Sequence, residues 1–268
     1  MEITLPLHKM HSRLNDDGIV EYTLANEHKK WLMNDIIGKQ LTIKYENAIY
    51  CISCGRKTNK SFNQGFCYPC FKNAPEASPC IIHPELCEAH LNKGRDVEWE
   101  QKHHNQPHIV YLSQTSHIKV GVTRDLQIPT RWIDQGAHAA LILAEVPYRR
   151  LAGEIEVALK PHISDKTNWR AMLQNTFKEE DLLSVKNKMK ELLPENLQQY
   201  ISSDNHIIEI KFPVINYPGK VKSLNLDKTP VYSGKLTGIK GQYLLFDDNT
   251  VFNVRKYGGY LVTLITSE

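Results

Sequence analysis

All six cysteines of this 268-residue chain lie between Cys51 and Cys87, so any sulfur chemistry is confined to one short segment. Four of them form two C-x2-C pairs, Cys51–Cys54 and Cys67–Cys70, about a dozen residues apart, which is the spacing of a zinc ribbon. Two thiolates three residues apart on a tight turn can share one tetrahedral ion. The pattern predicts a structural Zn2+ ion without an open coordination position. A redox pair or free thiols is the alternative.

A second and more widely spaced cluster follows the first. Cys80, Cys87 and His90 can supply three ligands of a Cys2His2 site, and a histidine further along the chain can supply the fourth. The alternative is a set of scattered side chains without metal. The predicted ligands are Cys80, Cys87, His90 and His104, with His83 and His103 left open as substitutes.

The overall composition is that of a globular protein, with 41% hydrophobic and 24% charged residues, which excludes a disordered or fibrous chain. The net charge of +3 is mildly basic and does not by itself identify a nucleic-acid-binding protein. The apolar run Ala139 to Ala144 is far shorter than the roughly 18 residues of a membrane span, and the N-terminus lacks a secretory signal. We therefore expect a cytoplasmic protein without membrane contact, in which clustered cysteines bind metal.

We expect an α+β protein with three domains, formed by residues 1–107, 108–200 and 201–268. The first domain carries the cysteine clusters on a β segment. Alternation of apolar residues from Leu41 to Tyr50 predicts a hairpin whose turn lies at Glu46–Asn47.

The middle domain is predicted to be an α/β core with a small central sheet, in the order strand, strand, helix, strand, helix. The last helix has its apolar residues on one stripe, which indicates that one face is buried. The predicted strands are 109–112, 118–123 and 139–144, and the predicted helices begin at Pro129 and Tyr148, with further helix between Trp169 and Tyr200.

The tail contains five or six short apolar strands between turn residues that include Gly234 and Gly238, which predicts a small β-barrel. Such barrels can bind oligonucleotides, and a packing or oligomerisation module is the alternative. The side chains of the tail that would suit nucleic acid are Lys220, Lys222, Lys235, Lys240, Arg255 and Tyr257.

Five short motifs follow one another in the middle domain. They are Val110-Tyr111-Leu112, Lys119-Val120-Gly121-Val122-Thr123, Thr130-Arg131-Trp132, Glu154-Ile155-Glu156 and Lys166-Thr167-Asn168. In this order they resemble the GIY-YIG nuclease superfamily, in the branches whose second motif reads K-I-G-x-T. No glycine precedes Tyr111, and lysine replaces the second tyrosine of the pattern. The zinc ribbon, this core and the β tail together look like a family without an assigned activity.

The resemblance implies a role for one residue in each motif. Tyr111 and Lys119 take the places of the two motif tyrosines, Arg131 that of the helix arginine, and Asn168 that of the late asparagine. Glu156 would bind a catalytic Mg2+ or Mn2+ ion, Arg131 would grip phosphate oxygens, and Tyr111 or Lys119 would accept a proton from water.

Each of these residues also has a structural interpretation. Tyr111 can be a core aromatic, Lys119 and Arg131 solvated charges, and Glu156 one half of a surface pair with Lys160. Helical periodicity does not distinguish Glu156 from Glu154, so only the resemblance selects Glu156.

Three functions remain open from the sequence. The first is a metal-dependent nuclease, or a related phosphodiester-acting enzyme, whose substrate is DNA or RNA. The second is a nucleic-acid-binding protein that keeps the fold without the chemistry. The third is a zinc-stabilised scaffold for protein partners or an enzyme acting on a nucleotide. The sequence does not indicate the oligomeric state.

Overall fold

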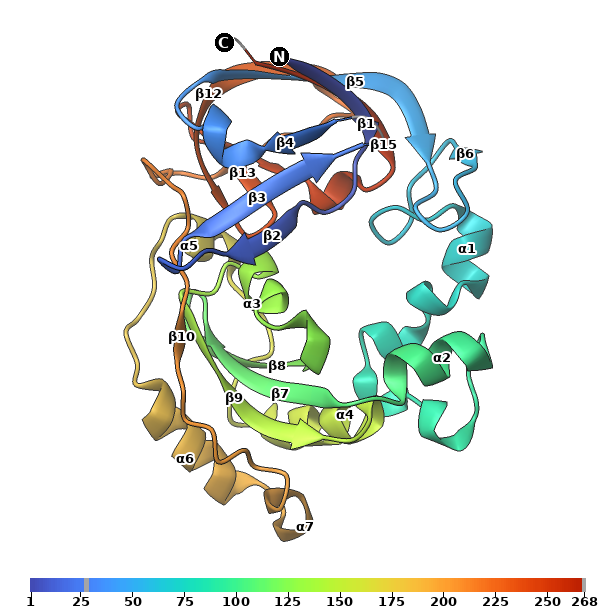
Figure 1. The fold of residues 1–268 in the computed structure, drawn as a ribbon, viewed down its shortest axis with the longest axis vertical. Helices are drawn as coiled ribbons and strands as arrows, with labels where there is room; N and C mark the ends of the chain where they lie inside the picture. Colours follow the sequence, from blue (N-terminus) through green and yellow to red (C-terminus); the bar gives the residue numbers. More distant parts are fainter. Residues whose placement is uncertain (27–28, 267–268) are drawn as a thin grey trace. The chain divides into compact units, whose positions relative to one another are not determined.

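The first and last strands of the chain lie side by side, since β1 (Glu2–Pro6) pairs with β15 (Tyr260–Thr266). Figure 1 shows this pairing in the computed structural model, which describes residues 1–26 and 29–266. The chain forms two compact units. One consists of Met1–Lys72, Leu173–Asn175 and Lys211–Glu268, and the other of Asn73–Met172 and Thr176–Ile210. The N-terminal segment and the C-terminal tail, expected in separate domains, therefore share a unit.

The first unit is built on an open eight-stranded sheet. Its strands follow the order β1-β15-β5-β12-β13-β14-β11, and β6 also pairs with β5. Because this path has two unpaired ends, the sheet of the described residues is not closed, and the predicted C-terminal barrel is wrong. The remaining strands are β5 (Gln40–Tyr50), β6 (Lys57–Thr58), β11 (Lys222–Ser223), β12 (Val231–Lys240), β13 (Tyr243–Phe246) and β14 (Thr250–Asn253).

The long strand β5 explains why no barrel forms. It pairs antiparallel with β15 on one edge and with β12 on the other, so the tail strands join the N-terminal ones. The predicted hairpin is also wrong, because β5 runs without a turn from Gln40 to Tyr50. Asn47, with φ of 54°, lies where the β5–β15 register shifts, so a bulge takes the place of the turn.

The tail contains strands, as predicted, but two glycines expected in turns are inside a strand and two proposed contact residues are buried. Gly234 and Gly238 are inside β12 rather than in turns. Lys240 and Tyr257 are buried, with exposed fractions of 0% and 1%, and therefore cannot present a nucleic-acid surface. A separate three-stranded sheet in this unit consists of β2 (His11–Leu14), β3 (Val20–Ala25) and β4 (Lys30–Leu32).

The second unit contains a four-stranded antiparallel sheet in the order β10-β9-β7-β8. Its strands agree with the sequence prediction: β7 (His108–Gln114), β8 (Ile118–Arg124) and β9 (Ala139–Val146), with the short β10 (Ile208–Glu209) added at one edge. The opposite edge is β8.

Helix α4 (Arg149–Leu159) packs on this sheet. Ile155 and Leu159 of α4 share a hydrophobic core with Val110 and Val120 of the sheet, as the apolar stripe of α4 predicts. None of the helices in the described part of the chain is long and apolar enough to cross a membrane. The other helices are α1 (Tyr68–Asn73), which begins in the first unit, α2 (Val97–His104), α3 (Thr130–Asp134), α5 (Trp169–Leu173), α6 (Leu182–Leu192) and α7 (Glu195–Gln198).

Candidate functional site

The first candidate metal centre is the ribbon formed by the two C-x2-C pairs. The sulfur atoms of Cys51, Cys54, Cys67 and Cys70 lie within 4.8 Å of one another. The Cys54 and Cys67 sulfurs are 3.8 Å apart, which is about the edge of a tetrahedron with Zn–S bonds of about 2.3 Å. Four thiols in this arrangement fit a structural zinc ion.

Local backbone conformation and one arginine prepare this ribbon for metal. The N–H of Gly55, whose φ is 69°, donates to the carbonyl oxygen of Cys51 at 2.9 Å and closes the first knuckle. Arg56 Nε donates to Cys54 Sγ at 3.4 Å, and this hydrogen bond lowers the pKa of the Cys54 thiol to about 6. The thiolate form of Cys54 is therefore favoured before metal binds, whereas burial raises the pKa of Cys70 to about 12.

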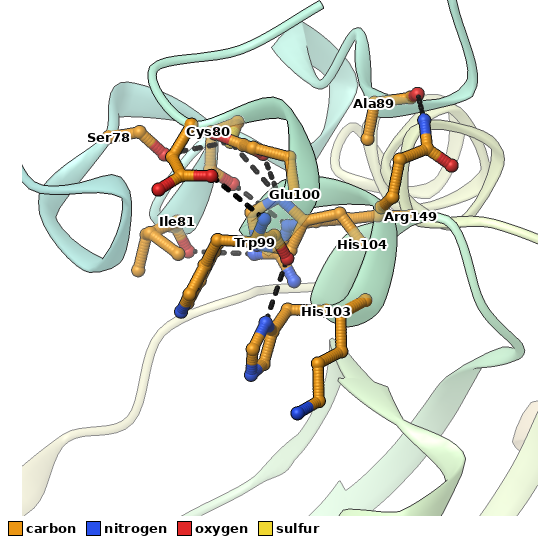
Figure 2. Close-up of polar contacts among 12 residues, drawn as sticks. Ser78, Cys80, Ile81, Ala89, Trp99, Glu100, His103, His104 and Arg149 are labelled. Carbon is orange, nitrogen blue, oxygen red and sulfur yellow. Dashed lines mark hydrogen bonds and ion pairs between the residues drawn. The ribbon is translucent and has the colours of Figure 1, made fainter. Parts of the chain in front are cut away.

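The second candidate metal centre brings together Cys80, Cys87, Glu100 and His104, whose ligand atoms also lie within 4.8 Å of one another. Cys80 Sγ is 3.7 Å from His104 Nδ1 and 4.0 Å from Glu100 Oε2 (Figure 2). Glu100 and His104 are four residues apart on α2, so they project from one face of the helix. Two thiols, a carboxylate and an imidazole are donors that zinc accepts.

This second centre is sealed from solvent, unlike the first. Its four residues are only 2% to 7% exposed. Burial raises the pKa of Glu100, while hydrogen bonding with Cys87, and further with His104, lowers the pKa of Cys80 to about 4. A buried carboxylate beside a buried thiolate is costly unless a cation balances them, so the donor set fits a divalent ion.

The sequence prediction named His90 as a ligand of this centre and did not include Glu100. In the structure Glu100 lies with the other three ligands, and His90 does not. The His90 ring instead stacks on Tyr148, with ring centroids 4.7 Å apart. His103 stacks on Trp99 at 4.1 Å, and His83 lies 3.3 Å from a Glu85 oxygen. The Glu-x3-His spacing on a helix was the signal that could have identified Glu100.

The loop between Cys80 and Cys87 packs directly on α4. A Cβ on Gly153 would lie 2.2 Å from the backbone nitrogen of Glu85, so only glycine permits this contact. Arg149, also on α4, donates to the carbonyl oxygens of Cys80 at 3.0 Å and Ile81 at 2.9 Å (Figure 2). The second metal centre is therefore attached to the helix that carries Glu156.

A cluster of buried ionisable side chains lies near edge strand β8. Tyr111 of β7 pairs across the sheet with Gly121, and a Cβ at Gly121 would lie 2.5 Å from the Tyr111 hydroxyl oxygen. The glycine of the second motif therefore gives the phenol its place over β8. The Tyr111 hydroxyl donates to Gln135 Oε1 at 2.9 Å, and burial raises the pKa of Tyr111 against the opposing effect of Arg131.

Lys119 is on the same face of β8 as Gly121, two residues away, and only 4% of it is exposed. Burial lowers the pKa of Lys119 to about 8, with a further decrease from the charge of Arg131 and an opposing effect from Glu156. Arg131 is half-buried in α3. Lys119 is thus not a solvated charge.

Glu156 of α4 is 8% exposed, whereas its neighbour Glu154 is exposed and pairs with Arg150 at 3.0 Å. A Glu156 oxygen lies 3.7 Å from Lys160 Nζ, so the expected pair exists, and burial raises the pKa of Glu156.

Asn168 is an exposed residue directly before helix α5. Its Oδ1 accepts from the backbone N–H of Ala171 at 3.2 Å, and its own N–H donates to Ser116 Oγ at 3.1 Å. The first contact begins α5, and the second joins Asn168 to the turn between β7 and β8. They do not join Asn168 to Tyr111 or Glu156.

Comparisons with known proteins identify a family of unknown function. Neither the curated proteins nor the solved structures include a match to this chain. One family model, described as a protein of unknown function (DUF2797), matches residues 38–262, which contain both candidate metal centres and the buried cluster. The chain therefore belongs to the DUF2797 family.

Proposed function

We propose that this protein is a zinc-containing, cytoplasmic enzyme that cleaves phosphodiester bonds in DNA or RNA, with a GIY-YIG-like core as its catalytic unit. The observation that carries the proposal is the placement of Tyr111 over Gly121, with Lys119 on the same face of β8. Arg131 and Glu156 act electrostatically on both of these side chains. Buried groups of opposite charge near an edge strand are typical of a site that handles charged substrates.

The pKa directions divide the roles among these residues. Lys119, with its pKa lowered to about 8, can accept a proton near neutral pH, whereas Tyr111, with its pKa raised, keeps its proton and orients a neighbour. Arg131 would bind non-bridging phosphate oxygens. Glu156 would hold a Mg2+ or Mn2+ ion, which would neutralise charge on the phosphate and on the departing oxygen.

The decisive experiment compares two isosteric variants on one helix. Glu156→Gln should reduce Mg2+- or Mn2+-dependent cleavage at least 100-fold, because the cation loses its carboxylate. Glu154→Gln, on the exposed side of α4, should cleave like the wild type. Cleavage is measured on plasmid, branched DNA and transfer RNA. Equal activity of the two variants would remove Glu156 from the mechanism.

The lowered pKa of Lys119 gives a pH dependence. A general base works in its deprotonated form, so kcat/KM should rise with pH and level off above about 8. In Lys119→Gln this limb of the profile should disappear together with most of the rate. A wild-type profile that is flat between pH 6 and 9 would assign the base elsewhere.

One observation favours a second function, a nucleic-acid-binding protein without catalysis. Tyr111 is fully buried and its hydroxyl is bonded to Gln135, which suits a core residue as well as a catalytic one. This function predicts salt-dependent binding to nucleic acid by the wild type without cleavage in any divalent metal.

A further inference from the structure

We propose that the zinc ribbon, residues 51–72, binds single-stranded nucleic acid through stacked bases and paired phosphates. This inference deepens the proposed function, on which it rests for the identity of the partner as nucleic acid. It concerns a surface distinct from Tyr111, Lys119, Arg131 and Glu156.

The charge of the ribbon is of one sign. Residues 51–72 contain four basic side chains and no acidic one. Arg56, Lys57, Lys60 and Lys72 are all exposed. Their four positive charges exceed the two negative charges of a zinc ion with four thiolates, so the surface attracts a polyanion.

Aromatic rings lie among these cations. The Phe62 ring is 5.4 Å from Tyr68 in an edge contact and 5.9 Å from Phe71 in a stacked one. Lys60 Nζ lies 5.2 Å from the centroid of Phe62. Tyr68 is 55% exposed, so a large part of an aromatic side chain is open beside the lysines.

The combination of exposed cations and an exposed aromatic ring favours single-stranded nucleic acid as the partner. Cations alone would suit any polyanion, including duplex nucleic acid, but an exposed ring gains most from a base that is free to leave its own stack. Base–aromatic stacking contributes to the affinity for single strands, because their bases are free to stack on a protein ring. The bases of a duplex are already stacked on one another. The ribbon therefore matches a single strand better than a duplex.

The test measures binding of the full zinc-loaded chain to fluorescein-labelled 15-nucleotide oligo-dT and oligo-U, and to a duplex of equal length, by fluorescence anisotropy. The wild type should bind single strands at least tenfold more tightly than the duplex. Tyr68→Ala should weaken single-strand binding roughly 5- to 100-fold, the effect of one stacked base, whereas Tyr68→Phe should retain most of the affinity.

The charges are tested separately. The double variant Lys57→Gln/Lys60→Gln should lower the slope of log affinity against log salt by about 1.4. The control Lys188→Gln/Lys190→Gln, which removes two exposed lysines of α6, should leave the slope unchanged. Each variant is compared at equal zinc content, which separates lost contacts from an unfolded ribbon.

Unchanged affinity in Tyr68→Ala and in the Lys57/Lys60 variant, or duplex binding as tight as single-strand binding, would overturn the inference. Its failure is distinguishable from failure of the proposed enzyme. Binding that depends on the ribbon, in a wild type that never cleaves, would reject catalysis and keep the ribbon surface. Cleavage by Tyr68→Ala with an unaltered KM would support catalysis and reject the ribbon as a binding surface.

Discussion

The two cysteine clusters differ in what surrounds them. The first holds four sulfurs on a small ribbon in which Cys54 is exposed and Arg56 contacts its sulfur. The second mixes two thiols with Glu100 and His104 in the interior of its unit. A metal ion in the first centre would order the exposed basic ribbon, whereas one in the second would hold the Cys80–Cys87 loop, which contacts the helix of Glu156.

The comparison indicates that a zinc ion at each centre would stabilise a different part of the chain. Loss of the first ion should affect the ribbon and leave the four-stranded sheet intact, because the ribbon belongs to the other unit. Loss of the second should reach α4, since Gly153 and Arg149 both contact the metal-bound loop. Three variants test the comparison.

The largest effect is expected when a ligand of the second centre is removed. Cys87→Ser should reduce zinc from two ions to one per chain and destabilise its unit by more than about 5 kcal/mol, because structural zinc supplies folding energy of about 10–16 kcal/mol. Elemental analysis and amide exchange of α4 measure both effects. Cys54→Ser should leave α4 protected, and equal loss of protection in the two variants would contradict the distinction.

A smaller effect is expected at the contact between loop and helix. Gly153→Ala should cost about 2–3 kcal/mol in thermal or denaturant unfolding, because the new methyl group collides with the Glu85 backbone. Gly219→Ala, whose Cβ would meet nothing within 4 Å, should change stability by less than about 0.5 kcal/mol. Stabilisation by Gly153→Ala, as helix propensity alone predicts, would mean that the loop does not rest on α4.

The smallest effect concerns Arg56 at the first centre. Without its guanidinium the pKa of Cys54 should rise from about 6 toward its ordinary value, so protons compete better with zinc. In Arg56→Gln the pH at which half of the first zinc is lost should rise by a few tenths of a unit. Zinc release measured with a chromogenic chelator tests this, and Lys57→Gln is the control.

Local sequence patterns predicted the positions of helices and strands well, but predicted poorly which strands pair with one another. Turn residues between short apolar runs located β13 and β15, and helical periodicity located α4, because both signals depend on neighbours along the chain. Two of the tail strands, β12 and β15, instead pair with β5, almost two hundred residues earlier, and no local pattern carries that information. For this reason the tail strands were predicted to form a small β-barrel among themselves.

The same limit applies to the candidate sites. The C-x2-C spacing placed four ligands together because the spacing itself determines the geometry. Glu100 was missed because the Glu-x3-His spacing on a polar helix is a weak signal, and only the burial of both side chains separates it from a pair of solvated charges. The pKa of Lys119 and the contact of Gly153 with Glu85 also depend on packing between segments distant in sequence.

The position of β5 has a consequence for how the protein is made. During synthesis this strand emerges early and soon meets the short β6 at its end, yet its two long partners, β12 and β15, begin only at Val231 and Tyr260. Most of the length of β5 therefore stays unpaired while the ribosome completes most of the polypeptide, and unpaired strand edges promote aggregation. Nascent chains truncated before β12 should require a chaperone to stay dispersed.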